Sequence, residues 1–181
     1  MKTIFRIIIC VSLLVLCAPH LRAETITHVF STDVAKFDKV NNVANKQATM
    51  KDGFVYTCGT SSAVFGAELI YSTSVIAINL PNSGSEVSTS VIENLTQVRI
   101  SHYPNAECTN LKVYVSTDGT SWGDPLSGDA MEYGLGTTFA DIPKGNYYLK
   151  IANSSSAPFS IIEMRYTTDP SSCACLQVVS Q

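Results

Sequence analysis

Hydrophobic and polar residues alternate along most of the chain after its first 23 residues. In residues 111–116, for example, Val113 and Val115 fall on one face, while Lys112 and Tyr114 fall on the other. A period of two is typical of a β-strand with one buried and one solvated face. The pattern recurs in five runs, and ten of its hydrophobic residues are expected to be buried between two sheets: Ile76, Ile78, Val98, Ile100, Val113, Val115, Leu149, Ile151, Ile162 and Met164.

The alternating runs are short and end at clusters of Pro, Gly, Ser and Asn, such as residues 81–85 and 143–145. Residues 34–48 are the only plausible helix, and they lack a clean stripe of period 3.6. Short strands separated by turns predict an all-β fold, an antiparallel two-sheet β-sandwich of the jelly-roll kind. No internal repeat of solenoid or propeller length is present.

The first 23 residues follow a different pattern. Lys2 and Arg6 precede an uncharged, largely apolar stretch over residues 7–17, and Ala23 supplies a small residue at a cleavage point. This order is typical of a secretory signal peptide, and the apolar stretch is too short to span a bilayer. We therefore expect a signal peptide at residues 1–23, a β-sandwich domain at 24–168, a C-terminal linker or tail at 169–181, and an extracellular or periplasmic location.

Removal of the predicted signal changes the charge balance. It takes three of the 12 Lys and Arg residues and none of the 15 Asp and Glu residues, which leaves a mature chain with a net charge of −6. An acidic chain without a basic cluster argues against nucleic acid and anionic membranes as partners. No later segment is apolar for long enough to form a membrane span.

Four cysteines remain after the signal, in an oxidising compartment. Cys58 and Cys108 are the pair most easily bridged, because Cys173 and Cys175 are too close in sequence to pair without strain. The spacing of these cysteines does not match a zinc site. Residues 173–179 form an apolar end that is either a terminal strand or a segment that docks onto a partner.

Three segments resemble one family of sandwiches. Residues 111–122 read LKVYVSTDGTSW, residues 143–153 read PKGNYYLKIAN, and residues 160–166 read SIIEMRY. In this order they resemble the discoidin-like, galactose-binding-like β-sandwich superfamily, which is found in accessory modules of secreted bacterial polysaccharide-degrading proteins. The resemblance covers roughly residues 70–168.

The resemblance implies a non-catalytic module that binds a polysaccharide or other glycan, beside an envelope or enzyme partner. Such sandwiches frequently carry a structural calcium ion, although no local carboxylate cluster here maps onto such a site. No other cofactor is expected. The alternative is a structural or assembly protein of the cell envelope with no glycan ligand.

Candidate ligand-binding residues are aromatic and polar side chains in turn-rich segments, because binding residues collect in the loops of a sandwich. These candidates are Tyr103, Asn105, Tyr133 and Trp122. An aromatic ring stacks on the apolar face of a sugar. For Trp122 a second interpretation stays open, in which the indole caps the core beside its hairpin.

An enzymatic function has little support in the sequence. His28 and His102 are the only histidines after the signal, and neither lies in a nucleophile or metal motif. Pairs of carboxylates could be drawn from Asp118, Asp124, Asp129 and Glu132, but acids in turns are ordinarily solvated. His102 is expected to be a polar loop residue.

Overall fold

The computed structural model describes residues 23–37, 46–60, 63–70, 73–103, 111–130 and 136–169. The predicted signal peptide, apart from Ala23, and nearly all of the predicted tail lie outside these residues, so the predicted domain boundaries stay predictions. The described residues form strands almost throughout, which confirms the all-β prediction. The elements are β1 (Glu24–Val29), α2 (Phe30–Asp33), β2 (Val34–Phe37), β3 (Gln47–Met50), β4 (Val55–Cys58), β5 (Val64–Ile70), β6 (Thr73–Leu80), β7 (Glu86–Thr89), β8 (Ile92–Tyr103), β9 (Leu111–Ser116), β10 (Asp129–Ala130), β11 (Thr137–Phe139), β12 (Gly145–Asn153) and β13 (Phe159–Thr168).

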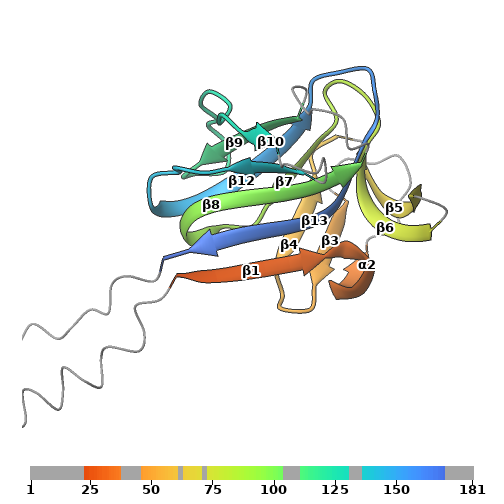
Figure 1. The fold of residues 1–181 in the computed structure, drawn as a ribbon, viewed down its shortest axis with the longest axis horizontal. Helices are drawn as coiled ribbons and strands as arrows, with labels where there is room; N and C mark the ends of the chain where they lie inside the picture. Colours follow the sequence, from red (N-terminus) through yellow and green to blue (C-terminus); the bar gives the residue numbers. More distant parts are fainter. Residues whose placement is uncertain are drawn as a thin grey trace, which may run out of the picture.

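Two antiparallel sheets pack face to face (Figure 1). In sheet A, β13 lies between β8 on one side and β1 and β6 on the other, with β5 beyond β6 and β11 beyond β8. Sheet B has the order β2-β3-β4-β7-β12-β9. Strand β12 joins the sheets, because its first residues pair with β8 and its later residues pair with β7 and β9. The predicted antiparallel two-sheet sandwich is confirmed.

The core between the sheets contains most of the residues that the alternation selected. Seven of the ten are buried, and Ile76 and Val115 are partly buried and pack against the core. The exception is Ile162, which is half-buried, while its neighbour Ile161 is fully buried. The pairing of β13 with β8 shifts between Ile161 and Glu163. An extra residue in a strand turns the following side chains to the opposite face, so period two fails at this bulge.

Two local predictions are wrong. The ends of the tentative helix at 34–48 are the strands β2 and β3, which pair with each other. His102 is not in a loop, because β8 continues to Tyr103 along β13. The His102 ring is 2% exposed, with its Nε2 atom 3.3 Å from the Thr137 hydroxyl oxygen. None of the helices among the described residues is long and apolar enough to cross a membrane.

Cys58 is a free thiol at the end of β4, and it is fully buried. Cys108 lies outside the described residues, as do Cys173 and Cys175, so the structure does not show the predicted Cys58–Cys108 disulfide and the pairing stays a prediction. Burial raises the pKa of Cys58 to about 11. The thiolate is the reactive form of cysteine, so a buried thiol with this pKa is inert.

We expect Cys58 in the folded chain to resist alkylation by iodoacetamide at about pH 8, and to react after denaturation. Mass mapping of the labelled peptides with and without a reductant also tests the disulfide. A bridged Cys58 reacts only after denaturation with reduction, whereas a free thiol reacts after denaturation alone. Rapid labelling of Cys58 in the folded chain would contradict its burial.

Candidate functional site

The outer face of sheet B carries a row of polar and aromatic side chains. Lys150 in β12 is in register with Ser88 of β7 on one side and with Tyr114 of β9 on the other. The row continues through Thr57 of β4 to Gln47 of β3. Four inter-strand spacings of about 4.8 Å give this row a length of about 19 Å. The face is therefore long enough to contact several units of an extended polymer.

Lys150 lies between two aromatic rings at one end of this row. Its Nζ atom is 4.9 Å from the centroid of the Tyr114 ring and 4.9 Å from that of the Trp122 ring. The same ammonium is 3.8 Å from Oε2 of Glu86. We call Tyr114, Trp122, Lys150 and Glu86 the aromatic platform. All four side chains are partly exposed, so the platform meets solvent while its members hold one another in place.

A tight turn places Trp122 on this face. Asp118 follows β9, and its Oδ1 atom accepts hydrogen bonds from the backbone N–H groups of Thr120 and Ser121 at 2.8 and 2.7 Å. These bonds hold the pKa of Asp118 well below its usual value, so the carboxylate is charged at neutral pH. Gly119 has a positive φ of 73°, which glycine adopts without strain.

The chain after Trp122 is also fixed to β9. The backbone N–H of Leu126 donates to the carbonyl oxygen of Val113 at 2.7 Å, and Leu126 packs against the core. Trp122 is thus held between the Asp118 turn and this second anchor. Its indole is half-buried and lies over Lys150, outside the hydrophobic core. Both interpretations of Trp122, as a cap beside its hairpin and as a ligand contact, stay predictions.

The platform has the chemistry that sugar binding requires. Aromatic rings offer flat apolar surfaces to the C–H faces of a pyranose. The ammonium of Lys150 donates hydrogen bonds, the carboxylate of Glu86 accepts them, and the hydroxyl of Ser88 does both. Each sugar hydroxyl both donates and accepts hydrogen bonds, so it can pair with any of these three groups.

Of the other predicted site residues, the structure describes only Tyr103, which does not lie at the platform. Tyr103 was expected in an exposed loop, but it is the last residue of β8, is half-buried and pairs with Ser160 in sheet A. Asn105 and Tyr133 lie outside the described residues, so their predicted roles stay predictions. Sequence reasoning missed Tyr114 and Lys150, although their common outward direction follows from the alternation that predicted β9 and β12.

A second group of residues was also missed, where the two sheets meet near β1. His28 is 3% exposed, and its Nε2 atom lies 2.8 Å from Oδ2 of Asp52 and 3.1 Å from the Tyr166 hydroxyl oxygen. Its Nδ1 atom lies 2.8 Å from the hydroxyl oxygen of Tyr56. A carboxylate only accepts, so Nε2 carries a hydrogen and donates to Asp52. We call these four residues the His28 network.

No group of three or more His, Cys, Asp or Glu side chains within the described ranges could hold a metal ion. The two described histidines, His28 and His102, are buried, with ring nitrogens next to hydroxyl or carboxylate groups. Their positions therefore account for them as structural residues.

Comparison with known proteins gives structural neighbours only. No family and no curated protein matches the sequence. Among solved structures, a family two carbohydrate esterase from Cellvibrio japonicus matches with a TM-score of 0.40 and 11% identity over 81% of this chain, which spans only 34% of the esterase chain. CBM35 from Paenibacillus barcinonensis matches with a TM-score of 0.43 and 15% identity, over 80% of this chain and 99% of that one. The low affinity xylan binding module CBM86 from Roseburia intestinalis matches with a TM-score of 0.37 and 14% identity, over 80% and 94%. At these TM-scores and identities, the matches carry no argument about what this chain binds.

Proposed function

We propose that this chain is a secreted, non-catalytic module that binds a polysaccharide through the outer face of sheet B. The observation that supports this most directly is the aromatic platform, in which Tyr114 and Trp122 flank Lys150 on a solvent-facing sheet. The signal-like first 23 residues support export. An envelope or enzyme partner would place the module near its polysaccharide.

The proposal predicts that Trp122→Ala and Tyr114→Ala each weaken polysaccharide binding about tenfold. A stacked ring contributes about 1 to 2 kcal/mol, and about 1.4 kcal/mol corresponds to a factor of ten. The measurement is affinity electrophoresis or pull-down on a panel of soluble and insoluble polysaccharides. Melting temperatures should change little, because both rings lie on the outer face and not in the core.

Tyr103→Ala is the matched control, because it removes a half-buried tyrosine from sheet A. If the platform is the binding surface, this control keeps the binding of the unchanged chain, whereas weaker binding would support the sequence-based prediction that Tyr103 contacts the ligand. If the folded chain is retained by no polysaccharide, the structural or assembly function becomes the better account. If both platform variants bind like the control, the platform is not the binding surface.

A further inference from the structure

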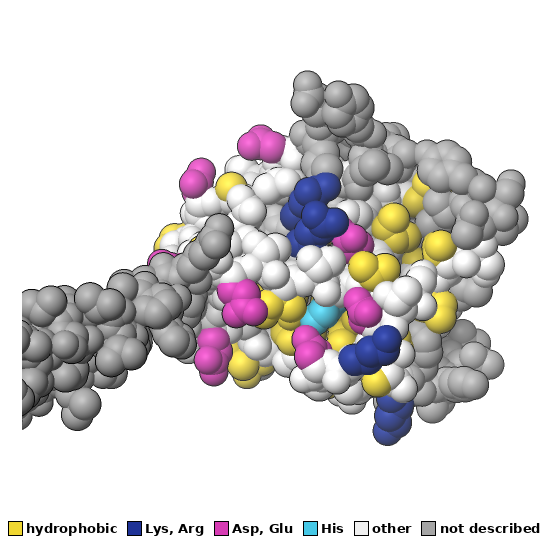
Figure 2. Space-filling view, turned by 60° about the horizontal axis from the view of Figure 1, so that its bottom comes forward, with side chains coloured by type: hydrophobic (Ala, Val, Ile, Leu, Met, Phe, Trp, Pro, Cys, Tyr) yellow, Lys and Arg dark blue, Asp and Glu magenta, His cyan; other side chains and the backbone are white. Residues whose placement is uncertain are grey.

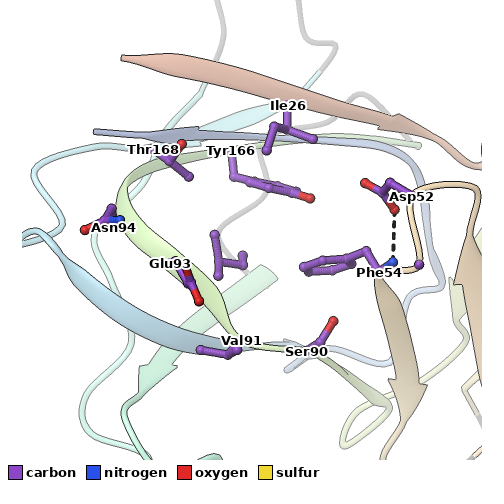
Figure 3. Close-up of a pocket in the computed structure, with 11 residues that line it drawn as sticks. Ile26, Asp52, Phe54, Ser90, Val91, Glu93, Asn94, Tyr166 and Thr168 are labelled. Atoms are coloured by element: carbon purple, nitrogen blue, oxygen red, sulfur yellow. Dashed lines mark hydrogen bonds between the residues drawn. The ribbon is translucent and has the colours of Figure 1, made fainter. Parts of the chain in front are cut away.

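A groove opens between the two sheets, away from the outer face of sheet B. It is lined by the turn before β4, the segment around the start of β8, and the β1 and β13 strands (Figure 3). Its volume is about 520 Å³. The His28 network lies at the inner side of the groove, because Asp52 and Tyr166 belong both to the network and to the groove lining.

One wall of the groove is aromatic and apolar. The rings of Phe54 and Tyr166 extend toward one another in Figure 3, with their centroids 5.4 Å apart and their planes at 27°. Tyr166 is buried and Phe54 is half-buried, so Phe54 is the ring that a ligand can reach. Val91, at 41% exposure, also lines the groove, and it is the one large hydrophobic side chain that the described residues leave exposed. Phe54 and Val91 together give the groove an accessible apolar wall, which is typical of a ligand pocket.

Among the described residues that line the groove, the charged ones are Asp52 and Glu93, and both are acidic. Oδ1 of Asp52 accepts from the backbone N–H of Phe54 at 2.9 Å, while Oδ2 faces His28, yet the side chain is still 49% exposed. Burial alone would raise the pKa of Asp52, but these hydrogen bonds lower it. The carboxylate is therefore charged at neutral pH. Glu93 is exposed and forms no ion pair within the described chain.

Figure 2 shows a face on which acidic, basic and hydrophobic side chains lie around a histidine. Two carboxylates beside an accessible ring suit a positively charged amine. An ammonium is attracted both to the carboxylates and to the face of an aromatic ring. Ser90, Asn94 and Thr168 add hydroxyl and amide groups to the lining, which suit a ligand that also carries hydroxyls.

We propose that this groove binds a cationic amino sugar, as found in a deacetylated amino-sugar polymer. The ammonium lies between Asp52 and Glu93, and the apolar face of the sugar ring packs on Phe54 and Val91. An N-acetylated sugar lacks the charge, and a uronic acid is repelled by the two carboxylates. This site goes beyond the proposed function, because it lies on a different surface from the platform and selects ligands by their positive charge.

The test compares two ligands that differ only in acetylation, the trimers of glucosamine and of N-acetylglucosamine, by NMR titration of the full chain at slightly acidic pH. We expect the glucosamine trimer to bind at least about tenfold more tightly, and its binding to weaken with added salt because both partners are charged. Shifted resonances should include those of Phe54 and Val91.

Glu93→Gln should weaken binding of the glucosamine trimer by about threefold to fivefold, the upper part of the range of one exposed ion pair. Asp124→Asn is the matched control, because it removes the same charge from an exposed loop outside the groove. Phe54→Leu should weaken binding as well, and its melting curve shows whether the fold is kept. Equal binding of both trimers, no binding of the glucosamine trimer by the folded chain, or an equal effect of Glu93→Gln and Asp124→Asn would overturn the proposal. Resonances of Phe54 and Val91 report on the groove and the indole resonance of Trp122 reports on the platform, so the two proposals can fail independently.

Discussion

Replacement of Ile151 by Asp should abolish folding of the domain. Ile151 is fully buried in the middle of sheet B, where its pairing partners Val87 and Val113 are fully buried as well. The nearest basic side chain on its own strand, Lys150, points to the opposite face. An unpaired buried carboxylate costs several kcal/mol, which is comparable to the total stability of about 5–15 kcal/mol of a small domain.

The adjacent residue provides the control for this substitution. Ala152 lies on the outer face of the same strand and is half-buried, with Lys112 and Glu86 as its cross-strand neighbours. Ala152→Asp should therefore change the unfolding free energy by about 1 kcal/mol or less. Far-ultraviolet circular dichroism and urea unfolding measure both variants. Cooperative unfolding of Ile151→Asp at the midpoint of the unchanged chain would contradict the assignment of the core.

The second large effect is expected for His28→Leu, at about 2–4 kcal/mol of unfolding free energy. Leucine fills a similar volume, but it leaves the buried Tyr56 hydroxyl without the His28 nitrogen 2.8 Å away. It also removes the partner of the Asp52 carboxylate and of the Tyr166 hydroxyl. Each buried polar group without a partner costs about 1–3 kcal/mol. Urea unfolding at neutral pH measures the loss.

The pH dependence checks the cause of this loss. Hydrogen bonds from Phe54 and His28 lower the pKa of Asp52 below its usual value of about 4, against the raising effect of burial. A lowered carboxyl pKa contributes stability above the unfolded value, and that contribution is lost as the pH falls through the folded value. The difference between His28→Leu and the unchanged chain should therefore shrink below about pH 4. Tyr103→Phe serves as a control outside the His28 network. A stability difference between His28→Leu and the unchanged chain that does not vary with pH would show that the Asp52 carboxylate does not cause the loss.

The alternation of hydrophobic and polar residues predicted the fold well, because a period of two fixes both the strand and its buried face. Val98, Val113 and Ile151 are buried as expected. The prediction failed where pairing with a distant strand decides the geometry. The bulge at Ile162 depends on the register of β13 against β8, and the extension of β8 to Tyr103 depends on the same partner.

The candidate sites were harder to predict, for the same physical reason. Trp122 was identified from its hairpin, but its contact with Lys150 requires that β9 and β12 be neighbours, although their sequences are separated by more than two dozen residues. The His28 network brings together residues from β1, the turn before β4, β4 itself and β13. No local pattern in the sequence connects these segments, so the groove beside them could not be found before the topology was known.

The central claim, polysaccharide binding at the aromatic platform, can be tested through Trp122, which is the only tryptophan in the chain. Its fluorescence reports on the platform alone. The folded chain is titrated with the soluble polysaccharide that retains it most strongly, and tryptophan emission is recorded during the titration. We expect a saturable change in the intensity or wavelength of the emission, at the concentrations that give retention, because a stacked sugar excludes water from the indole. Retention of the chain with no change in Trp122 emission at saturating polysaccharide would contradict the claim.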